Sequence, residues 1–364
     1  MFPRIELLDW MQGRPAAALH DLGTTGLRGT RDVGDAVVPD PVADRDDPPA
    51  GVNLHSLLAA EYGVHPKQVV VTAGASHAAF LAAAAAVTDS DADQPRALVE
   101  LPAYEPHAKT PAAVGAAVDR FRRTAEADFA LEPDRIEAAV RPATALVTAT
   151  NRHNPTGALA DRATLADAAD AAGTEDARLL VDEVYAPYVS ESDAERTAFG
   201  GPTAAGLDGA VVVNSLSKFF GLPDLRVGWL VADEAFAERA RAAKHHVPAV
   251  ADVTERLAAR AVHAAGAIAD EQRALCTENA ALLRSFVDDR PDVTGRVRPD
   301  CPFVALSAPG RPADELAAAA WEQGVLVVPG RFFGLDDRVR VSLGRSPEEN
   351  AAALTALDDV LGSP

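Results

Sequence analysis

In the first part of the chain, hydrophobic residues gather in short continuous runs and do not alternate with polar ones. Such runs are typical of strands buried on both faces, as in a mostly parallel sheet covered by helices. We predict strands at 68–73, 96–102, 116–121, 144–151, 177–185, 209–217 and 226–233. Helix-compatible stretches lie between them, at 54–63, 76–87, 132–141 and 161–172. This alternation predicts a large α/β domain.

The pattern changes after residue 233. A helical region is predicted for 234–289, where Arg290–Pro291 breaks it. The tail then predicts further strands and helices, in the order strand 302–307, helix 313–323, strand 325–330, strand 338–344 and helix 346–362. We therefore expect a second, smaller α+β domain. The expected division is an arm or lid with part of the small domain at 1–49, a large domain at 50–265 and the small domain at 266–364.

Composition narrows the possible partners. The chain has 364 residues, is 48% hydrophobic and carries a formal net charge of -20. That charge argues against nucleic acid as a partner and against docking on an anionic membrane, because both need a basic surface. A surface rich in Asp and Glu and poor in Lys resembles that of salt-adapted proteins, and a GC-rich genome is the alternative explanation.

Cysteine usage and the N-terminus indicate the compartment. Cys276 and Cys301 cannot form a disulfide framework, and without a CxxC pair we expect no metal site. The N-terminus lacks the basic start and apolar core of a signal peptide. The longest apolar run, 78–87, is too short to span a bilayer. We expect a soluble cytoplasmic protein.

Polar residues follow several predicted strands, at the edge where ligands bind in an open α/β sheet. A glycine-started turn with Ser76 follows one strand and suits a phosphate. Asn154 follows a second strand, Asp182 and Tyr185 end a third, and Lys218 follows a fourth. One edge of the sheet is thus expected to carry a phosphate turn, an amide, a carboxylate with a phenol, and an amine.

Pyridoxal phosphate is a ligand that needs all of these groups. Ser76 and Arg226 can bind its phosphate, the latter as a bidentate clamp. Asp182 can keep its ring nitrogen protonated, and Lys218 can form a Schiff base with its aldehyde. Asn154 and Tyr185 can donate hydrogen bonds to its phenolic oxygen, and Tyr104 can stack on its ring.

The order of these motifs resembles the class I/II aminotransferase family of fold-type I pyridoxal-phosphate enzymes. The resemblance runs from Leu54 to the C-terminus, through TAGASHA, PAYEPH, NRHNPTG, VDEVYAPY, SLSK with an arginine eight residues after the lysine, and RVRVSLG. It implies that Lys218 is the Schiff-base lysine and the proton shuttle. The cofactor-binding residues that it implies are Ala75, Ser76, Tyr104, Asn154, Asp182, Tyr185, Ser215, Lys218 and Arg226.

The resemblance also implies roles outside the cofactor contacts. His107 would support Asp182, the aspartate that binds the pyridine nitrogen. Arg340, with Asn154 beside it, would bind the substrate α-carboxylate. In a chain rich in arginine, a structural ion pair is the alternative role for Arg340.

Three features depart from the family pattern. Asp224 stands where the family usually has glycine. Segment 43–55 lacks the tyrosine that many members extend to the partner subunit's phosphate, although a homodimer remains the expectation. Segment 21–29, DLGTTGLRG, only loosely resembles the family's glycine-containing substrate loop.

The resemblance implies an aminotransferase that moves an amino group between an amino acid and a 2-oxo acid. A lyase, a cyclising synthase or a decarboxylase on the same scaffold is the alternative, because the motifs do not separate these reactions. A non-enzymatic regulator is disfavoured, since we see no room for a DNA-binding domain in this acidic chain. The substrate stays open: Arg28 and Arg31 could meet an acidic side chain, whereas the apolar part of segment 21–27 could serve an aliphatic or aromatic one.

Overall fold

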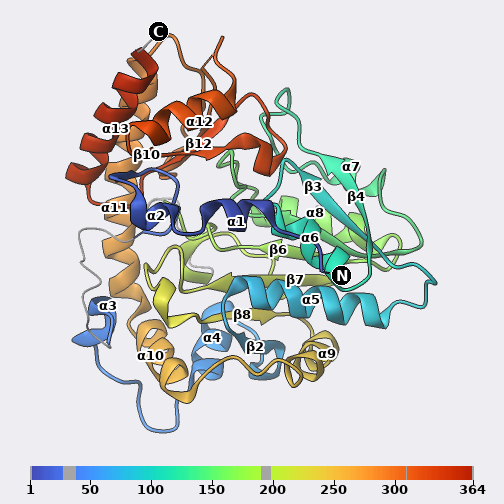
Figure 1. Cartoon of the computed structure of the whole chain (residues 1–364). Coiled ribbons are helices and arrows are strands. Elements are labelled where there is room, and N and C mark those ends of the chain that lie inside the picture. The colour runs from blue at the N-terminus through green and yellow to red at the C-terminus, as the bar shows by residue number, and fades with distance from the viewer. Residues whose placement is uncertain (1, 28–37, 190–197, 309, 363–364) are drawn as a thin grey trace.

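The structure is a computed structural model that describes residues 2–27, 38–189, 198–308 and 310–362 (Figure 1). Its largest sheet has seven strands in the order β2-β8-β7-β6-β5-β3-β4. Their bounds are β2 Val69–Thr72, β3 Arg96–Leu101, β4 Ala117–Arg122, β5 Thr144–Thr150, β6 Arg178–Asp182, β7 Ala210–Ser215 and β8 Gly228–Val231. Strand β8 pairs antiparallel with both neighbours, and the remaining pairs are parallel. The predicted strands and the mostly parallel sheet are confirmed.

Helices cover both faces of this sheet, which explains the continuous hydrophobic runs. Successive side chains of a strand point to opposite faces. Val70 therefore joins a core with α5 (Ala75–Asp89) and α9 (Glu234–Lys244), while Val69 and Val71 join the core on the other face. That second core includes residues of α4 (Leu54–Tyr62), α8 (Arg162–Gly173) and α10 (Asp252–His263).

A smaller antiparallel sheet lies toward the C-terminus, in the order β11-β12-β9. These strands are β9 Phe303–Leu306, β11 Val328–Pro329 and β12 Val339–Ser342. Val328 of β11 packs in a cluster with Phe332 and Phe333, whereas residues of β9 and β12 share another core with residues of α12 (Ala313–Glu322) and α13 (Pro347–Gly362). The long α11 (Ala265–Asp288) contributes to both this core and the large one, and it ends just before the predicted break at Arg290–Pro291.

The N-terminal segment contains short elements that the hydrophobic pattern did not predict. They are α1 Glu6–Met11, α2 Arg14–Ala17, β1 His20–Asp21 and α3 Asp40–Ala43. Strand β1 pairs with β10 (Val325–Leu326), beside the small sheet. Figure 1 shows α1 and α2 crossing between the part that holds α12 and α13 and the part that holds α5 and α6. Elements of two to six residues carry too few positions for a period to be recognised.

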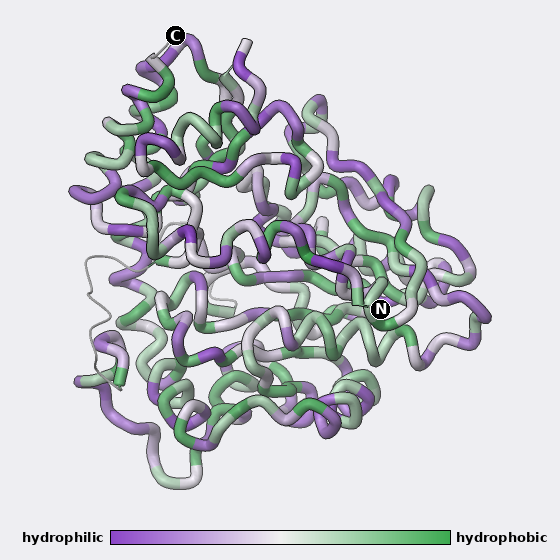
Figure 2. Tube along the Cα trace, viewed as in Figure 1, coloured by the Kyte–Doolittle hydropathy of each residue, from purple (hydrophilic) through white to green (hydrophobic). Residues whose placement is uncertain are grey.

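The remaining elements are short, and the sequence did not predict the eight-residue helix α6 among them. They are α6 Pro106–Ala113, α7 Pro133–Glu137 and the 3₁₀ turns at Pro66–Gln68, Ala198–Gly200, Pro223–Leu225 and Gly330–Phe333. Figure 2 shows hydrophobic residues concentrated in the interior strands and hydrophilic residues frequent in the outer loops and helices. None of the helices that the structure describes is long and apolar enough to cross a bilayer.

Candidate active site

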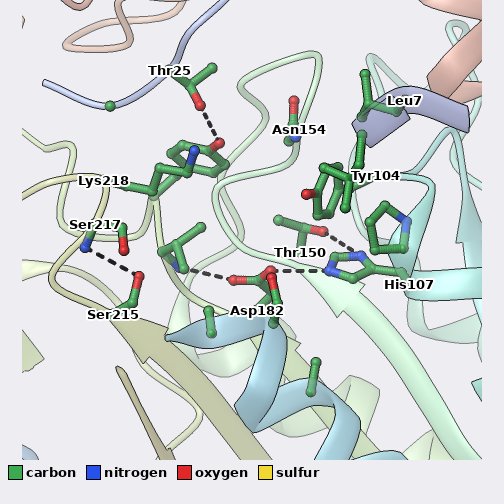
Figure 3. A pocket seen from close by; sticks show the side chains of 18 of the residues that line it. Leu7, Thr25, Tyr104, His107, Thr150, Asn154, Asp182, Ser215, Ser217 and Lys218 are labelled. Carbon is green, nitrogen blue, oxygen red and sulfur yellow. Dashed lines mark hydrogen bonds and ion pairs between the residues drawn. The ribbon is translucent and has the colours of Figure 1, made fainter. Parts of the chain in front are cut away.

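A cavity of about 400 Å³ lies at the carboxyl ends of the central strands. Polar side chains from these strand ends and from the N-terminal segment point into it (Figure 3). Every site residue predicted from the sequence borders this one cavity: Ala75, Ser76, Tyr104, His107, Asn154, Asp182, Tyr185, Ser215, Lys218, Arg226 and Arg340. Their roles remain predictions, but the fold brings together residues that lie far apart along the chain.

Asp182, the last residue of β6, is held from two sides. Its Oδ2 lies 3.0 Å from Nε2 of His107, and its Oδ1 accepts a hydrogen bond of 3.2 Å from the backbone N–H of Val184. The other ring nitrogen of His107 lies 3.4 Å from Oγ1 of Thr150, the last residue of β5. This chain of contacts, drawn in Figure 3, fixes the carboxylate at the bottom of the cavity.

The turn after β2 and the arginine after β7 form one end of the cavity. Gly74 has a φ of 94°, and a side chain at this position would bring a Cβ within 3.0 Å of an Nη of Arg226. Gly74 precedes α5 and gives it no side-chain cap, so the first N–H groups of this 15-residue helix are available to an anion. Ser76 and Ser215 line the same cavity, which makes this end suited to a phosphate.

Lys218 follows β7 and is partly buried. Its backbone carbonyl accepts a hydrogen bond of 3.1 Å from the N–H of Leu27, which ties the lysine segment to the N-terminal segment. Behind it, Phe219 and Phe220 are buried in the large core. The side chain lines the same cavity as Ser215 and Asp182 (Figure 3).

Arg340, on β12, brings the small sheet into the site. Its Nη1 donates to Oδ1 of Asn154 at 3.0 Å, and its Nη2 donates to the carbonyl of Gly23 at 2.6 Å. Its Nε is buried without a hydrogen-bond partner, and burial lowers the pKa of the guanidinium. Among the described residues no carboxylate forms an ion pair with Arg340, so the geometry does not support a structural ion pair. A buried guanidinium bonded only to neutral groups suits an incoming carboxylate.

The N-terminal segment adds residues that were not predicted from the sequence to contact the cofactor or the α-carboxylate. Oγ1 of Thr25 lies 2.6 Å from the hydroxyl of Tyr185, and the carbonyl of Thr25 accepts from Tyr188 at 3.1 Å. Gly23 and Gly26 border the cavity as well. The cluster of glycine and threonine in segment 21–27 was the available signal. Arg28 and Arg31, considered above for an acidic substrate, lie outside the described residues.

Tyr104 stands at the side of the cavity next to His107. The two rings meet edge to face, with centroids 5.5 Å apart. Burial raises the pKa of the Tyr104 phenol above its ordinary value. Asp224 is exposed on the 3₁₀ turn before Arg226 and does not line the cavity, and nothing in the structure explains its presence.

The donor set fits pyridoxal phosphate and does not indicate a metal. In the described ranges, no group of three or more His, Cys, Asp or Glu residues is placed to hold a metal ion. The cavity instead carries a phosphate-binding turn with an arginine at one end and a braced carboxylate at the other. The amine of Lys218 lines the same cavity (Figure 3), and these are the groups that a phosphorylated pyridine aldehyde requires.

Comparisons with known proteins identify the family and agree with this fold. A family model described as aminotransferase class I and II matches residues 51–357. The chain is 30% identical to capreomycidine synthase of Streptomyces vinaceus, over 99% of this chain and 94% of that protein. It is 28% identical to histidinol-phosphate aminotransferase 1 of Mesorhizobium japonicum, over 86% and 82% of the two chains. A pyridoxal-phosphate-dependent aminotransferase structure from Streptococcus suis shares the fold, with a TM-score of 0.81 at 23% identity over 99% and 98%.

The chain therefore belongs to the class I and II aminotransferase family, and it has the fold of type I pyridoxal-phosphate enzymes. It is a pyridoxal-phosphate-dependent aminotransferase, acting between amino acids and 2-oxo acids. The predicted family, fold class, reaction class and cofactor are confirmed. Because one relative is capreomycidine synthase, a cyclising synthase reaction remains the alternative, as a variant of the same chemistry.

Proposed function

We propose that this cavity performs transamination with Lys218 as its covalent and proton-transferring residue. The observation that supports it best is convergence: the phosphate turn, the Asp182–His107 pair, Lys218 and Arg340 border one cavity. When bound, pyridoxal phosphate supplies an electron-withdrawing ring that stabilises negative charge on the substrate carbon. The chain's own residues then have to bind, orient and move protons.

The cofactor would be held along its length by residues at the strand ends. Arg226, Ser76, Ser215 and the backbone at Ala75 would bind the phosphate. Asp182, braced by His107, would hold the ring nitrogen in its protonated form. The rest of the ring would be contacted by Asn154, Tyr185 and Tyr104.

Lys218 Nζ is proposed to hold the cofactor aldehyde until a substrate amine replaces it. A lysine amine released in this way can take the proton from the substrate α-carbon. Hydrolysis by one water, which supplies the keto oxygen, would then release the donor as a 2-oxo acid, and its nitrogen would stay in the site until a second 2-oxo acid accepts it and releases a water. Arg340 would orient the α-carboxylate throughout, since its buried Nε is free to donate.

The experiment joins covalent mapping to product analysis. The protein loaded with pyridoxal phosphate is reduced with borohydride, digested and mapped, and the label is expected on the peptide that contains Lys218. A panel of amino acids is then tested without an acceptor. Stoichiometric 2-oxo acid without ammonia supports transamination. Catalytic ammonia release contradicts it and favours a lyase, carbon dioxide release favours a decarboxylase, and a cyclised product favours the synthase reaction of the Streptomyces relative.

We also propose a division into a large cofactor domain at 50–265, a small domain at 266–364 and an N-terminal arm at 1–49. Support comes from the separate cores of the two sheets and from the break between α10 and α11 at Ala264. The protein is further proposed to act as a homodimer in a salt-rich cytoplasm, in keeping with its charge of -20. Light scattering at low and high salt tests the dimer and the salt dependence together.

A further inference from the structure

One side of the cavity is formed by helix α1. Leu7, Leu8 and Met11 of this helix all line the cavity. Leu7 and Met11 are four residues apart and share a face of the helix, with Leu8 beside them. Leu7 is 3% exposed, whereas Leu8 is 46% exposed and borders the cavity from the solvent side. We call these three side chains the α1 wall.

The α1 wall is fixed to both parts of the molecule. At its start, the Glu105 carboxylate accepts from the backbone N–H groups of Glu6 and Leu7, at 3.1 Å and 2.7 Å. The helix has no side-chain cap of its own at this end, so Glu105 satisfies two free donors. Leu7 packs in one cluster with Phe332 and Phe333 of the C-terminal part. Figure 3 shows Leu7 beside Tyr104, and Figure 1 shows α1 between the two parts.

The charged groups that line the cavity all have proposed roles other than binding the substrate side chain. Among the described residues that line the cavity, the titratable groups other than tyrosines are His107, Asp182, Lys218, Arg226 and Arg340. Each of them has a proposed duty toward the cofactor or the α-carboxylate. The α1 wall therefore presents hydrocarbon to the cavity, which is bordered by further apolar residues, Ala79, Pro106 and Pro223.

We propose that the α1 wall is the side-chain subsite, and that the preferred amino donor carries an uncharged aliphatic or aromatic side chain. This rests on the proposed function and specifies its substrate class. A carboxylate or phosphate set against Leu7 and Met11 would lose water without gaining a partner, which is unfavourable. Each methylene of the substrate that packs against the α1 wall should instead raise kcat/KM by roughly tenfold or more.

The first test compares donors on the holoenzyme. Values of kcat/KM are measured for leucine, methionine and phenylalanine against aspartate, glutamate and histidinol phosphate. At least about a tenfold preference for the uncharged group is expected. A preference for an acidic or phosphorylated donor overturns the subsite proposal. If no donor converts the cofactor and no label maps to Lys218, the proposed function itself fails, so the two failures are distinguishable.

Two variants test the wall directly. Met11→Ala should lower kcat/KM for the preferred donor by about tenfold, mainly through KM, because it removes contact surface. Leu8→Arg, at a half-exposed position, should raise the ratio of acidic to aliphatic donors by at least about tenfold, because it adds a cation at the cavity mouth. The control is Glu6→Gln on the same helix, whose side chain is exposed and does not line the cavity. Donor rankings that stay unchanged in both variants overturn the proposal.

Discussion

The two sides of the cavity are built in different ways. One side, which we call the strand-end floor, consists of Thr150, Asp182, Ser215 and Lys218 at or just after the ends of β5, β6 and β7. The opposite side consists of the α1 wall and the loop at 23–26. The floor is carried by buried strands, whereas the other side is held by a few contacts between distant residues, such as Glu105 to α1 and Thr25 to Tyr185. We expect the floor to govern chemistry and the other side to govern substrate choice.

Removal of Lys218 should have the largest effect. Lys218→Ala is expected to lower kcat by at least about a thousandfold, because it removes the proposed amine that holds the cofactor and moves the α-proton. Single-turnover absorption measurements of the cofactor band report this step. Lys67→Ala, at an exposed lysine outside the cavity, is the matched control and should behave like the wild type. A variant at residue 218 that turned over normally would place the reactive amine elsewhere.

Arg340→Lys should come next. It keeps a positive charge but loses the fork that can bind a carboxylate while bonding Asn154 and Gly23. We expect KM for the amino acid to rise about ten- to hundredfold, with cofactor binding unchanged. Arg338→Lys, two residues earlier and outside this cavity, controls for a general effect of the substitution. An equal loss for a simple amine that has no carboxylate would argue against carboxylate binding by Arg340.

Glu105→Ala should distinguish the role of the α1 wall from that of the strand-end floor. The loss of a helix cap costs about 0.5–2 kcal/mol, so α1 should exchange its amide hydrogens faster. The expected result is up to about a tenfold lower kcat/KM for preferred donors, with an unchanged affinity for pyridoxal phosphate. Glu105→Gln keeps one acceptor and should lie between the two. If weaker cofactor binding accompanied unchanged exchange in α1, Glu105 would belong to the floor instead.

Glu183→Gln should have the smallest effect on activity and a visible effect on stability. Burial raises the pKa of the Glu183 carboxyl to about 8, from an ordinary value of 4.5. Between these values the unfolded chain releases the proton and the folded protein keeps it, so this group makes stability fall as pH rises through that window. Urea unfolding at about pH 5 and about pH 8 should show a smaller fall in the variant. Identical pH dependence in both proteins would contradict the raised pKa.

The floor could be predicted from the sequence because each of its residues follows a recognisable strand. Asp182 and Lys218 come at the ends of continuous hydrophobic runs, and parallel strands deliver such ends to one edge. Ser76 and Gly74 were visible for a similar reason, since a glycine turn before a helix suits an anion. These signals are local, and each depends on only a few neighbouring residues.

The opposite side could not be predicted in the same way. Thr25 reaches Tyr185 across 160 positions of sequence, and Arg340 reaches Gly23 across 317. The six residues of α1 are too few for a reliable helical period. Its cap, Glu105, comes from a distant part of the chain and follows no local capping pattern.

The sequence alone therefore determined the family, the fold class, the cofactor and the residues expected to contact it, because buried strands and their polar ends are encoded by adjacent residues. Only the tertiary structure placed α1 against the cavity, paired Arg340 with Asn154 and Gly23, and revealed an apolar wall that lines the cavity. The physical reason is contact range. A wall assembled from short segments exists only when distant residues satisfy each other's hydrogen bonds and pack together, and no single stretch of sequence carries that information.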